Sequence, residues 1–323
     1  MGKKIVGMMS SYSGLTDVDW LWQQTPHPLG AWGNIQMLAT AAKPDFLLLY
    51  NFHNFPGLNT QKQGLAGFLD RFKQQLGTSE TNIQSWWRGV PQKRIICLVR
   101  EPPFESLLNK RIAEYQQAQM YCGYVSGPDD FAPIPDYMPA IWYHANSFRE
   151  LNEMGWPNKE KSCCWMTSGI DRTPDHRRRL DFLRLLRESG LEFDLYGRKL
   201  PNWADAYGKF NNKWNVMAPY YYNLAIENYA GNEWYVSEKL WDALLAWCLP
   251  IYYGGSAADK LLPPGSFLRL PSLDEKGIAY IQEVTASLDA WHEAKEAIAE
   301  ARQVILHKLN LLNFLSNLVE KLG

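Results

Sequence analysis

Three stretches in the second half of the chain decide its fold: YYYNLAIEN at residues 220–228, WYVSEKLW at 234–241 and PIYYGGS at 250–256. The first is an apolar run that ends in two polar residues, as expected of a buried strand at its carboxyl end. After a short loop, Ser237 can cap a helix that runs to Trp247. The third stretch predicts the next strand. This strand–helix–strand order favours a parallel, Rossmann-like half.

The same alternation continues outward from these stretches. Further strands are expected at residues 3–9, 45–50, 94–99 and 191–197, and a helix at residues 175–188. Pro102 and Pro103 end the third of these strands and force a loop at its carboxyl end, where parallel α/β proteins bind ligands. A proline-rich stretch at 127–160 is interpreted as a connection between two domains. The predicted division is therefore 1–150, 151–300 and a helical tail, 301–323.

The tail region from residue 282 onward is rich in Ala, Glu and Leu and is predicted to be helical. Its last part keeps an apolar stripe that includes Ile305, Leu309, Leu312 and Leu315. A stripe this continuous is not typical of a solvated face. It favours packing back on the body of the protein, with a dimer interface as the alternative.

Composition excludes several classes of protein. The chain has 323 residues, 46% of them hydrophobic, which is enough for two domains with sizeable cores. The formal net charge of −1 argues against a general nucleic-acid binder, which needs an excess of Lys and Arg. The five cysteines show neither disulfide nor zinc spacing, which favours a reducing compartment. Without an apolar run of membrane-spanning length or a signal peptide, we expect a cytoplasmic protein.

The predicted strand end and helix start bring several polar side chains together. Asn228, Tyr235, Glu238 and Lys239 cluster where a helix offers free N–H groups and a positive dipole. Lys239 adds a full charge for a phosphate, and Glu238 can accept hydrogen bonds from sugar hydroxyls. The alternative is that the Glu–Lys pair faces solvent and the aromatic residues are core. The cluster indicates a site for a nucleotide-sugar diphosphate.

Taken together, these stretches resemble the signature of the α-1,3-fucosyltransferase family, glycosyltransferase family 10. The family pattern is a Tyr-containing strand ending in Phe-Glu-Asn, a Tyr-[Val/Ile]-Thr-Glu-Lys helix start and a Pro-[Ile/Val]-Tyr-[Tyr/Trp]-Gly strand. The match runs from Tyr220 to Phe267, where the chain also has the family's Gly-Ser-Phe. Ile226 replaces the Phe, and Ser237 replaces the Thr. Both departures are mild.

The resemblance implies a GT-B fold, with two Rossmann-like domains facing each other across a cleft. It also implies GDP-L-fucose as donor, inversion at the anomeric carbon, and no cofactor or metal. By position, Lys239 matches the lysine that holds the diphosphate, Glu238 and Tyr235 match residues that contact the sugar and ribose, and Asn228 matches an asparagine of the donor pocket. The family also places an arginine at a helix start. Arg179 fits this place best, and Arg177 and Arg178 stay as alternatives.

The family's general base is a glutamate in the first domain, in a loop directly after a strand. Glu101 follows the strand predicted at residues 94–99 and is the candidate. The alternative is that Glu101 merely pairs with Arg100 or faces solvent. Family members often have Gly or Ser before the acid where this chain has Arg100, so the local loop shape differs. Acceptor-binding residues are not assigned.

Two further candidates are weaker. Asp129 and Asp130 could form a metal-binding pair, but they lie in the predicted connection, and the resemblance points to Arg and Lys for the diphosphate. His53 follows the strand predicted at 45–50 and could contact an acceptor sugar or be an ordinary loop histidine. Most of the tryptophans of the first half (Trp20, Trp22, Trp32, Trp86 and Trp87) are better explained as core than as stacking platforms for sugars.

The sequence thus predicts an inverting fucosyltransferase that moves L-fucose from GDP-fucose to a hydroxyl of an acceptor glycan, in α-1,3 linkage. One alternative keeps the fold and changes the nucleotide sugar. The other is a non-catalytic carbohydrate- or nucleotide-binding protein. Neither the acceptor nor the oligomeric state follows from the sequence.

Overall fold

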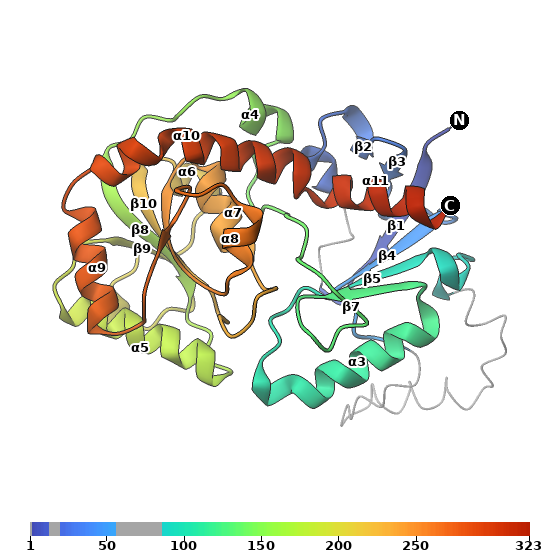
Figure 1. The fold of residues 1–323 in the computed structure, drawn as a ribbon, viewed down its shortest axis with the longest axis horizontal. Coiled ribbons are helices and arrows are strands. Elements are labelled where there is room, and N and C mark those ends of the chain that lie inside the picture. Colours follow the sequence, from blue (N-terminus) through green and yellow to red (C-terminus); the bar gives the residue numbers. More distant parts are fainter. Residues whose placement is uncertain (1, 13–19, 56–85) are drawn as a thin grey trace.

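A computed structural model describes residues 2–12, 20–55 and 86–323. Its strands form two separate sheets, each covered by helices (Figure 1). The first sheet has the order β2-β3-β1-β4-β5-β6-β7, and all neighbours pair parallel except β2 with β3. Its strands are β1 (Lys4–Met9), β2 (Ala31–Trp32), β3 (Ile35–Met37), β4 (Phe46–Tyr50), β5 (Ile95–Leu98), β6 (Tyr124–Gly127) and β7 (Ile134–Pro135).

The second sheet has the order β12-β11-β10-β8-β9 and is parallel throughout. It confirms the parallel half expected from the sequence. Its strands are β8 (Lys161–Ser168), β9 (Asp194–Arg198), β10 (Tyr220–Ile226), β11 (Leu249–Tyr253) and β12 (Leu268–Arg269). The helices around it are α5 (Pro174–Glu188), α6 (Lys213–Met217), α7 (Glu238–Leu245), α8 (Ala257–Leu261), α9 (Glu275–Thr285) and α10 (Asp289–Gln303).

The stretch interpreted as a connection, residues 127–160, is more ordered than expected. It contains β7, which extends the first sheet, and helix α4 (Phe148–Glu153), which begins with a capping box at Ser147. Pro135 is compatible with a strand because β7 lies at the edge of the sheet, where a missing N–H leaves no ladder bond unmade. Helix α3 (Leu108–Tyr121) precedes β6. The domain boundaries at residues 150 and 300 stay a prediction.

The tail is helical but not continuous. The chain leaves α9 at Thr285, starts α10 at Asp289, passes through a π-helical turn at Val304–Lys308 and ends in α11 (Leu311–Leu322). α10 packs on the second sheet, whereas α11 buries Leu312, Leu315 and Val319 in the core of the first. The tail therefore packs back on the body and crosses from one half to the other (Figure 1).

All five cysteines are free thiols and buried, as their spacing predicts. Within residues 2–12, 20–55 and 86–323, no helix combines the length and the apolar character needed to span a bilayer.

The carboxyl ends of the two sheets face each other. After β6, the main-chain oxygen of Pro128 accepts a hydrogen bond from Asn232 Nδ2 at 2.7 Å, and Asp130 Oδ1 accepts one from Trp234 Nε1 at 2.7 Å. After β5, the ring of Phe104 lies 5.2 Å from that of His176, near the start of α5. The loops that follow the strands of both halves thus enclose one common region, where parallel α/β folds place their sites.

Candidate active site

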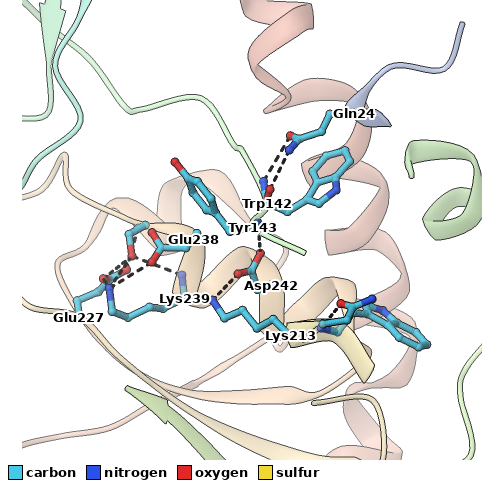
Figure 2. A network of polar contacts seen from close by, with 11 residues as sticks. Gln24, Trp142, Tyr143, Lys213, Glu227, Glu238, Lys239 and Asp242 are labelled. Atoms are coloured by element: carbon cyan, nitrogen blue, oxygen red, sulfur yellow. Dashed lines mark hydrogen bonds and ion pairs between the residues drawn. The ribbon is translucent and has the colours of Figure 1, made fainter. Parts of the chain in front are cut away.

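The buried carboxylate of Glu227 organises the start of α7. Glu227 follows β10, and its side chain accepts hydrogen bonds from Ser237 N at 2.7 Å and Ser237 Oγ at 2.6 Å. Lys239 Nζ donates to the same carboxylate at 3.2 Å (Figure 2). Ser237 is also the N-cap of α7, as the sequence predicts, because its Oγ accepts from the Lys239 N–H. The strand end, the cap and the lysine are therefore one rigid unit.

Charge pairing fixes the protonation of the first turn of α7. Lys239 Nζ lies 3.7 Å from Glu238 Oε1. Burial by itself raises the pKa of Glu238, but the charges of Lys239, Lys213 and Arg100 outweigh it and hold that pKa at about 2. Burial lowers the pKa of Lys239, and the carboxylates of Glu238 and Glu227 more than reverse this. Both side chains are fully charged at neutral pH.

The three consecutive arginines of α5 have different surroundings. Arg177 is exposed and donates to the main-chain oxygen of Asp171 at 3.0 Å. The guanidinium of Arg178, also exposed, lies 5.7 Å from the centre of the Tyr253 ring. Arg179 is only 2% exposed. It is therefore the one of the three that the fold buries at the strand ends.

Arg179 and Asn228 lie together beside the Glu227 unit. Arg179 Nη1 donates to Asn228 Oδ1, and Nη2 donates to the main-chain oxygen of Ser168 at the end of β8, at 2.7 Å. Burial lowers the pKa of Arg179 to about 10, and the negative charge of Glu227 opposes the decrease. The guanidinium stays charged at neutral pH. Two cations, Arg179 and Lys239, thus face the same loop from two helices.

Glu101 lies in the loop after β5, as predicted. Its Oε1 accepts a hydrogen bond from the Tyr12 hydroxyl at 2.8 Å, and its main-chain oxygen accepts one from Arg111 Nη2 at 3.0 Å. Burial, followed by the charge of Glu101, raises the pKa of Tyr12, so the phenol stays protonated and can only donate to this carboxylate. The bond from Tyr12 therefore holds one of the two oxygens of the Glu101 carboxylate at a defined place.

Tyr235 connects the glutamates of the two halves. The ring is buried, and burial raises the pKa of its phenol far above the usual value. The negative charges of Glu227, Glu238 and Glu101 add to that increase. The charge of Glu101, in the loop after β5, therefore acts on a side chain that lies just before α7.

Residues 156–293, from just before β8 into α10, match the sequence profile of "Glycosyltransferase family 10 (fucosyltransferase) C-term". This part of the chain is thus similar to the C-terminal domain of glycosyltransferase family 10. The resemblance inferred from the motif is thereby confirmed. α-(1,3)-Fucosyltransferase C of Drosophila melanogaster is 29% identical in an alignment of 148 positions, which covers 42% of this chain and 31% of the relative. The match thus spans about a third of the relative's length.

Solved structures are similar over nearly the whole chain. An α-glucosyltransferase in complex with UDP-glucose and DNA containing an abasic site has a TM-score of 0.57 at 8% identity, with all of both chains covered. An α1,3-fucosyltransferase has a TM-score of 0.47 at 14% identity and covers 91% of this chain and 81% of its own. The fold, two parallel sheets facing each other, is that of GT-B glycosyltransferases, as the motif implied.

The family 10 domain holds every donor-site residue named from the sequence: Arg179, Asn228, Tyr235, Glu238 and Lys239. Glu101 lies outside the matched residues, in the first half of the chain. Its charge acts on Tyr235 within the matched residues, but the family match does not extend to its role.

His176 lies beside the candidate site and is not among the residues that the sequence indicates. It lies in the first turn of α5, its Nδ1 is 2.7 Å from Thr173 Oγ1, and its ring packs on Phe104 of the first half. Burial, followed by the charges of Arg179 and Lys239, lowers its pKa to about 4. The imidazole is therefore neutral at pH 7. Its position three residues before Arg179 is the signal that could have identified it.

The weaker candidates from the sequence, Asp129, Asp130 and His53, contact other side chains of the protein. Asp129 accepts a hydrogen bond from the Tyr115 hydroxyl at 2.7 Å, and Asp130 accepts the bond from Trp234 described above. His53 Nδ1 lies 3.2 Å from Glu114 Oε1. Over the part of the chain that the structure describes, no group of three or more His, Cys, Asp or Glu side chains could hold a metal ion.

Proposed function

We propose that this chain is an inverting fucosyltransferase that transfers L-fucose from GDP-fucose to a hydroxyl of an acceptor glycan, in α-1,3 linkage. The observation that carries the proposal is a pair of cations at the strand ends of the part that matches family 10: Arg179 of α5, which is buried, and Lys239 at the start of α7, which is partly buried. A nucleoside diphosphate needs positive charge and free N–H groups, and this place offers both.

The donor would bind with its diphosphate between Arg179, Lys239 and the amino end of α7. Asn228 orients the Arg179 guanidinium, and Glu227 holds Lys239 in place. Glu238, charged at neutral pH, can accept hydrogen bonds from hydroxyls of the ribose or the sugar, and Tyr235 closes the pocket beside it. Because these groups are fixed before the donor arrives, they can stabilise the charge that develops on the leaving diphosphate.

Glu101 would act as the general base. Its carboxylate takes the proton of the acceptor hydroxyl while that oxygen bonds to the anomeric carbon, and the bond from this carbon to the diphosphate oxygen breaks with its electron pair on GDP. Attack opposite the leaving group inverts the anomeric carbon, and the transition state is oxocarbenium-like, as in other glycosyl chemistry. A well-placed base contributes about 10²–10⁴ in rate. The Tyr12 hydrogen bond keeps one carboxylate oxygen oriented.

A donor panel tests this function. GDP-fucose, GDP-mannose, UDP-glucose and UDP-galactose are offered with a set of glycan acceptors, and release of the nucleotide is measured. We expect acceptor-dependent turnover of GDP-fucose, with an inverted linkage to the acceptor O3 by NMR. Turnover of another sugar nucleotide would support the alternative donor. Tight GDP binding without turnover of any donor would instead indicate a non-catalytic binding protein.

A further inference from the structure

Arg100 is buried next to the proposed base and has an unsatisfied donor. It follows β5 directly, is 8% exposed and donates from Nη1 to the Tyr50 hydroxyl at 2.9 Å. Its main-chain N–H donates to Asn51 Oδ1 at 2.5 Å, which fixes the start of the loop that carries Glu101. Among the described residues, Nη2 has no hydrogen-bond partner. A buried guanidinium with an unmade bond costs free energy, so it calls for a ligand.

The surroundings of Arg100 place it on the donor side of the cleft. Tyr143 lies beside it, and the main-chain N–H of Tyr143 donates to Asp242 Oδ1 on α7 at 3.3 Å. Glu238 precedes Asp242 by four residues and therefore projects from the same face of α7. Figure 2 shows the Tyr143 ring alongside Glu238. Arg100 thus faces the first turn of α7 across Tyr143.

Electrostatics agrees with this placement. Burial by itself lowers the pKa of the Arg100 guanidinium, but Tyr50, Tyr143 and the Glu238 carboxylate more than reverse this. The charge of Arg100 in turn helps to keep Glu238 ionised. The Glu238 carboxylate thus already offsets the positive charge of Arg100. The buried, unpaired Nη2 therefore suits a neutral oxygen acceptor, such as a hydroxyl, better than a further anion.

We propose that Arg100 is a specificity-determining residue, whose Nη2 donates a hydrogen bond to a hydroxyl of the sugar being transferred. The inference rests on the proposed function, because it requires a sugar between Glu101 and the start of α7. The family pattern, with Gly or Ser before the acid, cannot make this contact. Arg100 would thus give this chain a means of selecting its donor sugar that relatives with a small residue lack.

A cycle that pairs protein variants with altered donors tests the proposal. Arg100→Met keeps the length of the side chain and removes the donor, and Arg94→Met serves as the control, because Arg94 donates to Gly323 O at the surface, away from the cleft. The donors are the nucleotide sugar identified by the panel and its analogues that each lack one hydroxyl. The readouts are kcat/KM and the calorimetric affinity for free GDP.

We expect Arg100→Met to lower kcat/KM about 10–100-fold while GDP affinity stays within about twofold, since one charge-assisted hydrogen bond to the sugar is lost. With the unsubstituted chain, one deoxy analogue should lower kcat/KM by the same factor as Arg100→Met does with the complete donor. With Arg100→Met, that analogue should lower kcat/KM no further. The proposal would be overturned if, for every analogue, the loss of kcat/KM from the missing hydroxyl and the loss from Arg100→Met multiplied. It would also be overturned if Arg100→Met lowered GDP affinity by the same factor as kcat/KM. If Arg100→Met does not fold, Arg100→Lys, which keeps the charge but misplaces the donor, is taken through the same cycle.

The two proposals can fail separately. If the panel identifies another sugar nucleotide, the fucose assignment is wrong, but the cycle is run unchanged with that donor. If the natural chain turns over GDP-fucose and no analogue is coupled to Arg100, only the role of Arg100 is lost. A chain that turns over no sugar nucleotide contradicts both. A change in the pH profile of kcat, without coupling to any hydroxyl, would show that Arg100 acts through Glu101.

Discussion

Replacing Arg179 and Lys239 one at a time by methionine should separate donor binding from stability, because different groups compensate the two cations. Lys239 lies within 4.0 Å of two carboxylates, those of Glu227 and Glu238. Arg179 donates to an amide oxygen and to main-chain oxygens, and no carboxylate among the described residues forms an ion pair with it. Its charge is therefore the more available one for a ligand.

The free energies follow from these contacts. Burial lowers the pKa of Arg179 from 12.5 to about 10. Since one pKa unit corresponds to 1.36 kcal/mol, keeping Arg179 charged lowers the free energy of unfolding by about 3 kcal/mol. Arg179→Met relieves this cost and loses hydrogen bonds of similar total value, so its stability should stay within about 2 kcal/mol. Lys239→Met removes the cation that pairs with the buried Glu227 carboxylate and should lower the free energy of unfolding by about 3–5 kcal/mol. The melting temperature should then fall by about 10 °C.

Affinity for GDP should follow the opposite order. Arg179→Met removes a fork of charged donors, and we expect about 100-fold weaker binding. Lys239→Met removes one charge that already pairs with two carboxylates, and we expect about 10-fold weaker binding of GDP. Calorimetry with GDP and thermal melts without ligand measure the two quantities. Lys260→Met, which breaks a surface pair with Glu233, is the control and should change neither. Unchanged GDP affinity in Arg179→Met, or a larger loss of stability there than in Lys239→Met, would refute this reasoning.

Four further predictions follow from the same contacts. Glu101→Gln should lower kcat about 10²–10⁴-fold with GDP affinity nearly intact, measured by single-turnover kinetics and calorimetry, and an equal loss of affinity would contradict the role of base. Excess EDTA should leave GDP binding unchanged, because Arg179 and Lys239 supply the positive charge, and a loss of binding by calorimetry would show that a metal is needed. The melting temperature should fall as pH drops from 6.5 towards 5. In the folded protein His144 and His176 have pKa values of about 3 and 4, below the usual 6.5, so the unfolded chain binds more protons in this pH range. The variant His144→Gln should therefore lose less stability over the same range. Leu315→Ala in α11 should cost about 2–5 kcal/mol in chemical denaturation, whereas the exposed Glu320→Ala should cost little, and equal stability of the two would show that the tail is not part of the core.

Local patterns of the sequence were enough to predict several features of the site. The burial of Arg179 among three arginines agrees with helical spacing, because Phe182, Leu183 and Leu186 occur three, four and seven residues later and are all buried. Its contact with a diphosphate stays a prediction. The start of α7 at Ser237 follows from capping chemistry. These features depend on contacts between neighbours in the chain, which the order of residues specifies directly.

Contacts between distant segments could not be predicted in this way. The order of residues shows Glu227 as the polar end of an apolar run, but not that its carboxylate bonds the cap of the next helix, ten residues later. His176 and Phe104 come from different halves and meet only after both have folded. The direction of a side chain in a loop after a strand depends on what packs above it. The sequence offered a pair with Arg100 as one alternative for Glu101, and it could not show that the Arg100 guanidinium donates to Tyr50.

The division of the site between two halves explains why the contacts across the cleft matter for catalysis. The cations belong to the family 10 domain and the proposed base to the first half, so the distance from base to anomeric carbon depends on how the halves sit. Two hydrogen bonds fix one side of this arrangement: Asn232 to the main-chain oxygen of Pro128, and Trp234 to Asp130. A third hydrogen bond between the halves joins Tyr143 to Asp242. Because a displacement of about 1 Å at a reacting centre can cost about 100-fold in rate, these contacts affect turnover without touching a substrate. Natural variation at the interface could therefore tune kcat while leaving the donor-binding groups unchanged.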